Sequence, residues 1–521
     1  MMVQGTASSV GKSLVSAALC RIYARRGLAV APFKSQNMSN NAAAIGEGLE
    51  IGRAQALQAA AAGVEPSVDM NPILLKPETD ARAQIVLMGR PWKTVSAGGY
   101  GADRPILWEA ATDALARLRA SADLVVIEGA GSPAEINLRE GDIVNMAVAR
   151  HAGAPVLLVG DIDPGGVFAQ FAGTLALLLP PERALVKGLI INKFRGDRGL
   201  LDPGLRMIEG REGLPVLGVV PWLPGLGLAE EDAQSLPRSG APGDARGKGG
   251  LDIAVIHYPH IANFDDFDAL GLEDGVRLRF VERAEELGWP DAVVLPGTKA
   301  TLADLDWLRA AGLDEGVRWL ARAGRGVVGI CGGYQMLGRN LSDPDGVEGP
   351  PRVLPGLGLL EADTRFVPGK HVGRRRGRVI GGPGFFAPAA GLELEGYEIH
   401  AGETHAAAAD AKPLFRLEAH DDVALDDGVL DDGAASRGGL VWGSYLHGIF
   451  DLPAFRRAWL ASLPGGDGAG RLFDGKGLAL ADAREAALDR LADAVEAALD
   501  MDSISRIAGI DASSRARKEH A

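Results

Sequence analysis

The stretch VVGICGGYQML, residues 327–337, joins an apolar run to a helical pattern through the turn Gly-Ile-Cys-Gly-Gly. A strand that stops at a G-x-C-x-G turn and then enters a helix places the central residue in a strained, exposed elbow. Cys331 would be accessible there, next to backbone amides that can bind an oxyanion and at a helix N-terminus that favours the thiolate. The alternative is a small buried apolar residue beside a tight turn. The stretch predicts an α/β domain with Cys331 as a candidate nucleophile.

Length and charge limit the possible classes of protein. With 521 residues the chain is too long for one hydrophobic core, so two large domains are expected. Hydrophobic residues make up 47% and charged residues 23%, which is typical of soluble globular proteins. The formal net charge of −14 argues against broad nucleic-acid binding, because phosphate-backbone affinity needs a concentrated basic surface.

Cysteine content and apolar runs bear on the compartment. The two cysteines, Cys20 and Cys331, provide no disulfide framework, and the N-terminus lacks the pattern of a secretory signal. No stretch approaches the ~20 uninterrupted apolar residues that span a bilayer. We therefore expect a cytoplasmic protein without a membrane span.

Residues 1–232 alternate apolar strand candidates with helical patterns. This alternation predicts a largely parallel sheet covered by helices on both faces. Ligands then bind at the carboxyl ends of the strands. The expected strands are residues 30–33, 124–127, 156–159, 189–191 and 216–220.

A second α/β series follows a stretch with little that could enter a core. Residues 233–250 are rich in Gly, Pro, Ser and charged residues and predict an interdomain linker. The second domain is expected over residues 251–463 and contains the cysteine elbow. Residues 464–521 would then form a C-terminal segment, with an amphipathic helix over 481–499 that packs on the body of the protein and a frayed polar tail after Ser503.

The N-terminus carries a glycine loop between a short strand and a helix. Strand, loop, lysine, hydroxyl and helix occur in the order that cradles phosphate, with Lys12 towards the β and γ oxygens and Ser13 on Mg²⁺. Five residues rather than four separate Gly5 from Gly11, so this is not a strict Walker A motif, and a chance Gly-Lys-Ser is the alternative. The candidate nucleotide-binding residues are Gly5, Thr6, Ser8, Val10, Gly11, Lys12 and Ser13.

Three later strand ends add candidates for the same site. Glu128 follows an apolar strand, where a carboxylate can hold Mg²⁺ directly or through water, and it is the leading metal ligand. Asp161 is a second metal candidate, although it could simply cap the next helix. Asn192 and Lys193 could contact the nucleotide base, or they could be an ordinary polar strand end.

Several motifs together resemble the cobyric acid synthase family, the glutamine-dependent amidotransferases of cobalamin biosynthesis. The first domain resembles that family's synthetase domain, which is similar to dethiobiotin synthetase, and the second resembles its class I glutamine amidotransferase-like domain. The match covers most of the chain, and the combination is specific although each motif alone is weak or moderate. The motifs are residues 4–6, 32–39, 71–77 and 191–197 in the first domain and residues 295–299, 329–333, 396–400 and 444–448 in the second.

The resemblance assigns roles in the second domain. Cys331 would be the nucleophile and His447 its general base, while backbone amides of Gly332 and Gly297 would hold the oxyanion. Triad glutaminases are expected to place a Glu two residues after the histidine, but that position is Ile449 here. A Cys-His dyad, or a base oriented by another group, is therefore implied. For a histidine taken alone a structural role is favoured, and His400 keeps that interpretation, or lines the glutamine site.

The resemblance also implies the reaction. ATP, with Mg²⁺, would phosphorylate a side-chain carboxylate of the corrinoid adenosylcobyrinic acid a,c-diamide, and ammonia from glutamine would displace the phosphate. Amidation at the b, d, e and g carboxylates would give cobyric acid. Candidate contacts to the phosphates or the corrinoid are Lys34, Asn37, Asn41 and Lys76, of which Lys76 could equally be a surface charge.

Two other functions stay open. The paralogous cobyrinic acid a,c-diamide synthase shares the two-domain chemistry, but the segment at residues 36–39 favours cobyric acid synthase. A P-loop switch or partitioning ATPase with an inactive glutaminase-like domain belongs to a different class, and glutamine hydrolysis would distinguish it.

Overall fold

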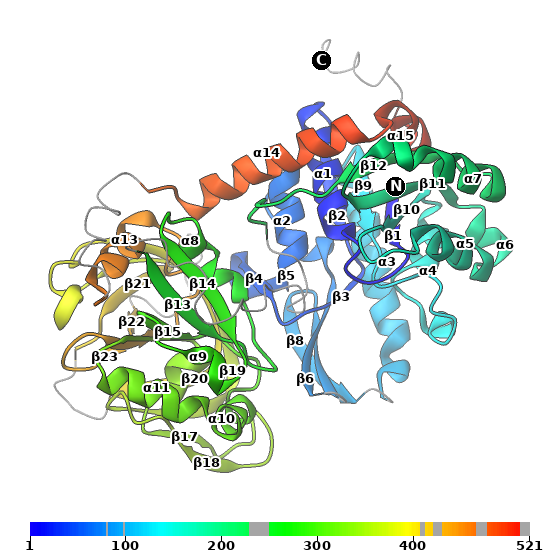
Figure 1. Ribbon diagram of the computed structural model, residues 1–521. Helices are drawn as coiled ribbons and strands as arrows, with labels where there is room; N and C mark the ends of the chain where they lie inside the picture. The colour runs from blue at the N-terminus through cyan, green and yellow to red at the C-terminus, as the bar shows by residue number, and fades with distance from the viewer. Residues whose placement is uncertain are drawn as a thin grey trace, which may run out of the picture. The chain divides into compact units, whose positions relative to one another are not determined.

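The computed structural model describes residues 1–79, 82–96, 99–228, 250–406, 412–419, 430–464 and 477–510. The chain forms two compact units (Figure 1). Unit 1 contains residues 1–39, 51–232 and 484–521, and unit 2 contains residues 40–50 and 233–483. This division differs from the expected contiguous domains at two places, residues 40–50 and the C-terminal segment. Nearly all of the expected linker lies outside the described residues.

Unit 1 is built on a six-stranded sheet with the order β12-β11-β10-β1-β9-β2. All five pairings are parallel. The central strands are buried on both faces, which explains their continuous apolar runs and why each expected strand is found. The strands are β1 Met2–Gly5, β2 Val30–Phe33, β9 Leu124–Glu128, β10 Val156–Asp161, β11 Val186–Phe194 and β12 Val216–Pro221.

Helices cover both faces of this sheet, as the alternating pattern predicts. One core contains the inner side of α1 and the C-terminal helices, and a second core on the other face contains residues of α3, α4, α5 and α7. A four-stranded sheet, β3-β6-β7-β8, extends the unit. The bounds are α1 Lys12–Arg25, α2 Arg53–Ala62, α3 Arg104–Ser121, α4 Met146–Ala152, α5 Val167–Leu177, α6 Pro180–Arg183, α7 Asp202–Glu212, β3 Gln36–Met38, β6 Ile73–Thr79, β7 Arg82–Leu87 and β8 Arg90–Ser96.

The C-terminal helix α14, Leu480–Ala498, packs along α1 (Figure 1). Its apolar side joins the core of unit 1 through Leu488, Leu491 and Val495. The predicted amphipathic helix and its packing are confirmed. The expected start of the frayed tail at Ser503 is wrong, because α15, Met501–Ile507, continues the structure and buries Ile504 completely.

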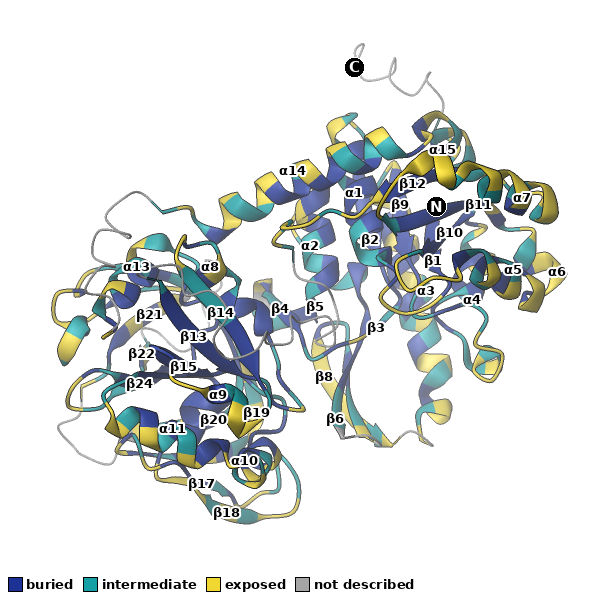
Figure 2. Ribbon diagram, viewed as in Figure 1, coloured by how far each residue is buried: buried dark blue, intermediate teal, exposed yellow. Residues whose placement is uncertain are grey.

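Unit 2 contains a second largely parallel sheet with the order β14-β13-β15-β16-β24-β23. Its central strands are buried, while α10 and α11 turn exposed sides away from it (Figure 2). The bounds are β13 Leu251–Ile256, β14 Val276–Val281, β15 Ala292–Leu295, β16 Gly326–Ile330, β23 Ala434–Ala435, β24 Val441–Ser444, α8 Asp268–Gly271, α9 Ala284–Leu287, α10 Thr301–Ala310, α11 Leu313–Arg322, α12 Gly332–Leu337 and α13 Pro453–Ser462.

A mixed sheet that the sequence analysis did not predict completes unit 2. Two long antiparallel strands, β19 Ala362–Val379 and β20 Glu393–Ala406, form its centre. The order is β18-β17-β19-β21-β22, with β20 paired to β19. The other strands are β17 Asn340–Asp343, β18 Arg352–Pro355, β21 Phe415–Ala419 and β22 Leu430–Asp432.

Residues 40–50 leave the sequence of unit 1 and belong to unit 2. This inserted segment contains β4, Ala42–Ile45, a short 3₁₀ turn, Gly46–Gly48, and the start of β5, Leu49–Gly52. It contacts β19 and β20. Its fully buried Glu50 pairs with Lys370 of β19 at 2.7 Å, because a carboxylate out of water needs a cation partner. Within the described residues, no helix combines the length and apolarity needed to cross a bilayer.

Candidate active sites

The glycine loop of unit 1 has the predicted strand-loop-helix arrangement. β1 ends at Gly5 and α1 begins at Lys12, with Gly11 in the left-handed region at φ 94°. A Cβ at Gly5 would lie 2.6 Å from the Val10 side chain and 2.9 Å from the Ala7 carbonyl oxygen. The loop therefore folds back tightly over the end of β1, as a phosphate cradle requires.

Two polar side chains fix this loop from within. The buried ammonium of Lys12 donates to the Ala7 carbonyl at 2.9 Å and to the Gly131 carbonyl at 3.1 Å. The Thr6 hydroxyl donates to Gln170 Oε1 at 2.9 Å. Both of these acceptors are neutral carbonyl oxygens, so these two contacts fix the ammonium in the loop without neutralising its charge. Ser8 lies on the same loop, with its hydroxyl 3.9 Å from where a Cβ at Gly131 would stand.

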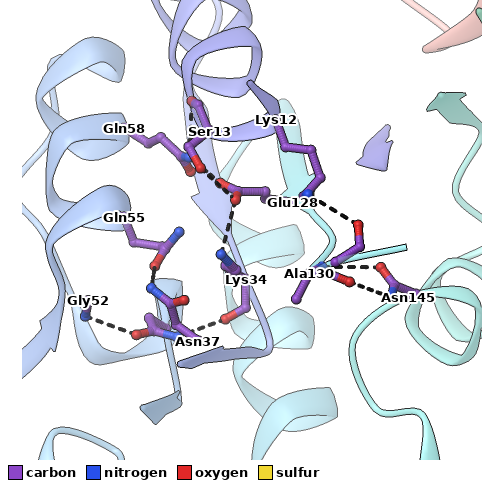
Figure 3. A network of polar contacts seen from close by, with 12 residues as sticks. Lys12, Ser13, Lys34, Asn37, Gly52, Gln55, Gln58, Glu128, Ala130 and Asn145 are labelled. Carbon is purple, nitrogen blue, oxygen red and sulfur yellow. Dashed lines mark hydrogen bonds and ion pairs between the residues drawn. The ribbon is translucent and has the colours of Figure 1, made fainter. Parts of the chain in front are cut away.

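Glu128 is the centre of a buried polar network beside the loop (Figure 3). Its side chain is fully buried and accepts hydrogen bonds from Ser13 Oγ at 2.8 Å, Lys34 Nζ at 3.0 Å and Gln58 Nε2 at 2.5 Å. The two predicted metal ligands of the loop region, Ser13 and Glu128, are thus brought into contact. Gln58 was not predicted, since nothing in the α2 pattern distinguishes it from a surface glutamine.

The remaining strand-end candidates are Asp161, Asn192 and Lys193, and two of them contact the glycine loop. Asn192 Nδ2 donates to the Val10 carbonyl at 2.9 Å, and a Cβ at Gly11 would lie 2.1 Å from the same nitrogen. Lys193 Nζ donates to the Ser9 carbonyl at 2.7 Å. Asp161 Oδ2 pairs with Lys193 Nζ at 3.2 Å, and its Oδ1 accepts from the Asp163 amide at 2.9 Å. Asp161 therefore closes a local turn and pairs with Lys193, and it does not cap the next helix, because α5 begins after Gly166 without a side-chain cap. Asn192 helps to hold the loop.

Carboxamides gather next to Lys34 (Figure 3). Asn37 Nδ2 donates to Gln55 Oε1 at 3.1 Å, and the Gly52 amide donates to Asn71 Oδ1 at 2.9 Å. A Cβ at Gly52 would lie within 3.0 Å of three of these side chains, so only glycine fits there. Asn71 Nδ2 in turn donates to the Lys34 carbonyl at 3.1 Å.

Two candidates lie in places that the sequence did not indicate. Lys76 is buried on β6, so its interpretation as a surface charge is wrong. Asn41 belongs to unit 2, where its side-chain oxygen accepts from the Asn263 amide. Both asparagines are buried.

The cysteine elbow of unit 2 has the predicted strained backbone. β16 ends at Ile330, Cys331 has φ 51° and ψ −110°, and α12 begins at Gly332. A Cβ at Gly333 would lie 1.9 Å from the Leu295 carbonyl oxygen, so the elbow needs glycine there. The expected exposure is wrong: Cys331 is only 7% exposed, since β20 passes over it and the Ile399 carbonyl accepts its thiol at 3.5 Å.

His447 is held between Cys331 and an acid. Its Nδ1 donates to Asp266 Oδ2 at 2.6 Å, and Cys331 is close enough to act on the pKa of the ring. Burial alone would lower the pKa of His447, but Asp266 and Cys331 raise it to about 10. The imidazolium form is therefore stabilised beside the cysteine, which favours a thiolate. Asp266 is the orienting group that the sequence left unidentified.

Asp266 is itself fixed in place. Its Oδ1 accepts from the Gly448 amide at 3.1 Å and from the Tyr397 hydroxyl at 3.3 Å. The Tyr397 ring stacks on His447 with centroids 5.1 Å apart, and the two residues exchange backbone hydrogen bonds. The arrangement forms a Cys-His-Asp triad in which the acid comes from far upstream, which makes it different from the histidine-proximal Glu of ordinary triad glutaminases.

The predicted oxyanion residues flank the cysteine. A Cβ at Gly297 would lie 2.9 Å from His447 Cε1 and 3.7 Å from Cys331 Cβ. A Cβ at Gly332 would lie 3.3 Å from the Thr298 amide nitrogen. Gly297 thus lies close to both His447 and Cys331, while Gly332 follows the cysteine directly and packs against Thr298.

His400 lies on β20 and stacks on Tyr445 with centroids 3.9 Å apart. Burial, with the nearby His371 ring, lowers the pKa of His400 to about 3, so this imidazole is neutral near pH 7. Its Nδ1 donates to the Gly402 carbonyl at 2.9 Å. The Tyr445 hydroxyl contacts Thr404 at 2.6 Å and accepts from Gln335 at 3.2 Å. These contacts hold the His400 ring in place, which agrees with the structural role favoured from sequence.

Comparison with known proteins gives consistent similarities for both halves. Residues 1–236 match the CobQ/CobB/MinD/ParA nucleotide binding domain, and residues 252–455 match the CobB/CobQ-like glutamine amidotransferase domain. A cobyric acid synthase of Roseiflexus castenholzii is 53% identical and covers 89% of this chain and 91% of its own length. A cobyric acid synthase of Sorangium cellulosum is 52% identical and covers 98% and 99%, respectively. A third, of Chloroflexus aggregans, is 52% identical over 89% of this chain and 91% of its own length.

Proposed function

Because this chain belongs to the cobyric acid synthase family, we propose that Cys331, His447 and Asp266 release ammonia in unit 2 and that the glycine-loop site of unit 1 activates a carboxylate. The enzyme is a glutamine-hydrolysing ligase that amidates cobyrinic acid to cobyric acid. Its substrates are glutamine and a corrinoid, and its first domain binds a nucleotide.

The geometry of Cys331, His447 and Asp266 supports glutamine hydrolysis in unit 2. The Cys331 thiolate attacks the amide carbon of glutamine, and backbone amides at Gly332 and Gly297 receive the developing oxyanion. His447 donates a proton to the leaving nitrogen, so ammonia departs and a thioester forms. Water then attacks the thioester with His447 as base, which releases glutamate. Asp266 keeps the ring oriented and stabilises its charged form.

The ligase half rests on the loop and the network around Glu128. ATP is the nucleotide whose phosphates the loop would hold, with Lys12 towards the β and γ oxygens. Ser13 and Glu128 offer a hydroxyl and a carboxylate 2.8 Å apart, a donor set that suits a hard cation with further water and phosphate ligands. They would hold Mg²⁺, which would offset phosphate charge during transfer.

The acceptor in unit 1 would be a side-chain carboxylate of the corrinoid. Carboxylates are poor acyl donors, because oxide is a poor leaving group, so phosphorylation precedes attack by ammonia. Lys34 and Asn37 are buried next to Glu128 and its neighbours, and Lys76 lies on the strand paired with β3. We assign these three to the phosphates or the carboxylate that is activated. Adenosylcobyrinic acid a,c-diamide is the proposed substrate, amidated at its b, d, e and g carboxylates.

A turnover assay with defined corrinoids tests the proposal. The purified protein with ATP, Mg²⁺ and glutamine is offered cobyrinic acid or its a,c-diamide, and products are resolved by mass spectrometry. We expect the diamide to gain four amide nitrogens, with glutamate and ADP formed in step. Exclusive use of cobyrinic acid would instead assign the chain to a,c-diamidation. Glutamine-independent ATP hydrolysis without any amidation would contradict the ligase function.

A further inference from the structure

The inserted segment of residues 40–50 is fastened to the glutaminase through a pair of buried asparagines. Asn41 Oδ1 accepts from the Asn263 amide at 2.8 Å, and Asn263 Oδ1 accepts from the Ala42 amide at 3.1 Å. The residues are 222 positions apart in sequence, and both side chains are almost fully buried. A reciprocal pair of buried hydrogen bonds fixes one backbone against the other, because losing either partner leaves a polar group unsatisfied.

Asn263 occupies a special backbone position. Its φ of 52° and ψ of 45° lie in the left-handed region, which costs energy for a residue with a side chain, although asparagine tolerates it better than most. The 3₁₀ turn Phe264–Phe267 begins directly after it, and the Asp266 amide donates to the Asn263 carbonyl at 3.1 Å. Strained turns of this kind persist only when neighbouring contacts hold them. The Asn41 oxygen is one of those contacts.

Asp266 links this turn to the chemistry. Its carboxylate holds His447 at 2.6 Å, and His447 lies beside Cys331, which acts on its pKa. We propose that Asn41 is a positioning residue of the glutaminase, acting through Asn263 and Asp266 on His447, and that the inserted segment links glutamine hydrolysis to the state of the ligase site. The inference rests on the proposed glutaminase function, which it deepens.

The inserted segment leaves and re-enters unit 1 at residues close to the carboxamides beside Lys34. β3 ends at Met38, three residues before Asn41. It carries Asn37, whose side-chain amide donates to Gln55. After the segment the chain reaches Gly52, whose amide donates to Asn71. Both flanking positions therefore belong to the carboxamide group beside Lys34. A ligand that rearranges this group would act on both ends of one short covalent segment.

The segment is also anchored near its far end. Glu50 pairs with Lys370 of β19, and a Cβ at Gly48 would lie 3.1 Å from the Val372 carbonyl oxygen. Anchors at Asn41 and at Glu50 restrict the ways in which the segment can move, so a displacement passed along the chain reaches the asparagine pair instead of being absorbed by a loose loop. Coupling of two sites requires a physical element of this kind.

Two variants separate positioning from simple loss of structure. Asn41→Ala removes the acceptor, whereas Asn41→Asp keeps a side-chain oxygen at the same position. We expect Asn41→Ala to lower kcat for glutamine-dependent amidation by about 10- to 100-fold, as for loss of an outer residue that orients a catalytic group, with little change in KM for glutamine. Asn41→Asp should restore most of the rate. Amidation with added ammonia should stay within about twofold in both, because Asn41 belongs to unit 2 and unit 1 keeps its own residues. An equal loss with ammonia would instead assign Asn41 to the ligase substrate and overturn the positioning role.

Asn40→Ala is the matched control, since the neighbouring Asn40 side-chain oxygen has no hydrogen-bond partner among the residues that the structure describes. It should behave as the wild type. A wild-type kcat in Asn41→Ala, or a loss in Asn41→Ala that Asn41→Asp fails to restore, would overturn the positioning role. If Asn41→Ala does not fold, as judged by thermal unfolding, Asn41→Gln takes its place, because one extra methylene displaces the acceptor from the Asn263 amide. It should lose glutamine-dependent turnover while ammonia-dependent turnover is kept, and a wild-type rate with glutamine would overturn the positioning role.

Coupling is measured as the ratio of glutamine hydrolysis rates with and without ATP and the corrinoid. The wild type should be stimulated, and Asn41→Ala should lose most of the stimulation. Equal stimulation in the two proteins would overturn the coupling. The absence of any glutamine hydrolysis in the wild type would instead contradict the proposed glutaminase, so the two failures are distinguishable.

Discussion

Two buried carboxylates, Glu128 in unit 1 and Asp266 in unit 2, are surrounded by hydrogen-bond donors in similar ways but face different cations. Glu128 accepts from a hydroxyl, an amide and the ammonium of Lys34. Asp266 accepts from a hydroxyl, a backbone amide and the ring of His447. A lysine keeps its proton near neutral pH, whereas a histidine can give its proton up.

The difference separates a binding site from an acid-base site. The Lys34 and Glu128 pair presents fixed charges, which suits recognition of phosphates and a cation. The His447 and Asp266 pair presents a proton that can move to a leaving group and return. Damage to the first pair should therefore affect every nitrogen source, while damage to the second should affect glutamine alone.

Lys12→Ala should give the largest loss. Removing the loop cation takes away charge that offsets the transferred phosphoryl group, so ATP-dependent amidation should fall by about 10³-fold with glutamine and with ammonia alike. Initial rates with each nitrogen donor at saturating ATP provide the measurement. Lys187→Ala, at an exposed lysine, is the control and should leave both rates unchanged. ATP-dependent turnover retained in Lys12→Ala would rule out the phosphate role.

Asp266→Asn should lower glutamine-dependent turnover by about 10²- to 10⁴-fold and spare ammonia-dependent turnover. The asparagine keeps the size of the side chain but not its charge, so burial and loss of the carboxylate should lower the pKa of His447 from about 10. The imidazolium form of His447 is then lost at lower pH, so the basic limb of the pH-rate profile should shift to lower pH. A profile that keeps its basic limb near the wild-type position would show that Asp266 does not tune this histidine.

His400→Phe should have a moderate effect, because His400 is held by packing and does not change its charge near neutral pH. The phenyl ring keeps the stacking on Tyr445 but loses the hydrogen bond to the Gly402 carbonyl. We expect kcat/KM for glutamine to fall by no more than about tenfold. The pKa of His400 is lowered to about 3, so the shape of the pH-rate profile between pH 5 and 9 should not change. A lost limb in that range would give His400 an acid-base role.

Arg25→Ala should have the smallest effect. Arg25 joins α1 to α14 through ion pairs with Asp489 and Asp493 that lie on the surface, where water screens them. The free energy of unfolding should fall by less than about 1 kcal/mol, and amidation should be unchanged with either donor. Urea unfolding at low and high salt provides the measurement. A loss that persists in high salt would indicate packing of the arginine stem instead.

The parts of the molecule that sequence predicts are those with local or repetitive signals. β9 and β10 are buried on both faces, so they read as continuous apolar runs, and the glycine loop and the cysteine elbow each lie within one short stretch. α14 shows its apolar side at helical spacing. The burial of Cys331 was not predictable, since the strand that covers it is far away in sequence.

Long-range contacts explain the rest of what sequence missed. Asp266 and His447 are 181 positions apart, and no fixed spacing connects an acid to its base in this way. His447 itself came only from family resemblance. The inserted segment at residues 40–50 has a composition like that of its neighbours, so its membership of unit 2 depends on contacts such as those of Asn41 and Glu50. The assignment of Gln58 depends likewise on where Glu128 lies.

The most direct test of two separable sites is one comparison of nitrogen donors in Cys331→Ala. The variant lacks the nucleophile but keeps every residue of unit 1, so initial rates of corrinoid amidation are measured with glutamine and with added ammonium at the same ATP concentration. We predict that the glutamine-dependent rate is lost and that the ammonia-dependent rate stays within about twofold of the wild type. Continued glutamine use would contradict the assignment of Cys331, and loss of both rates would contradict the separation of the two sites.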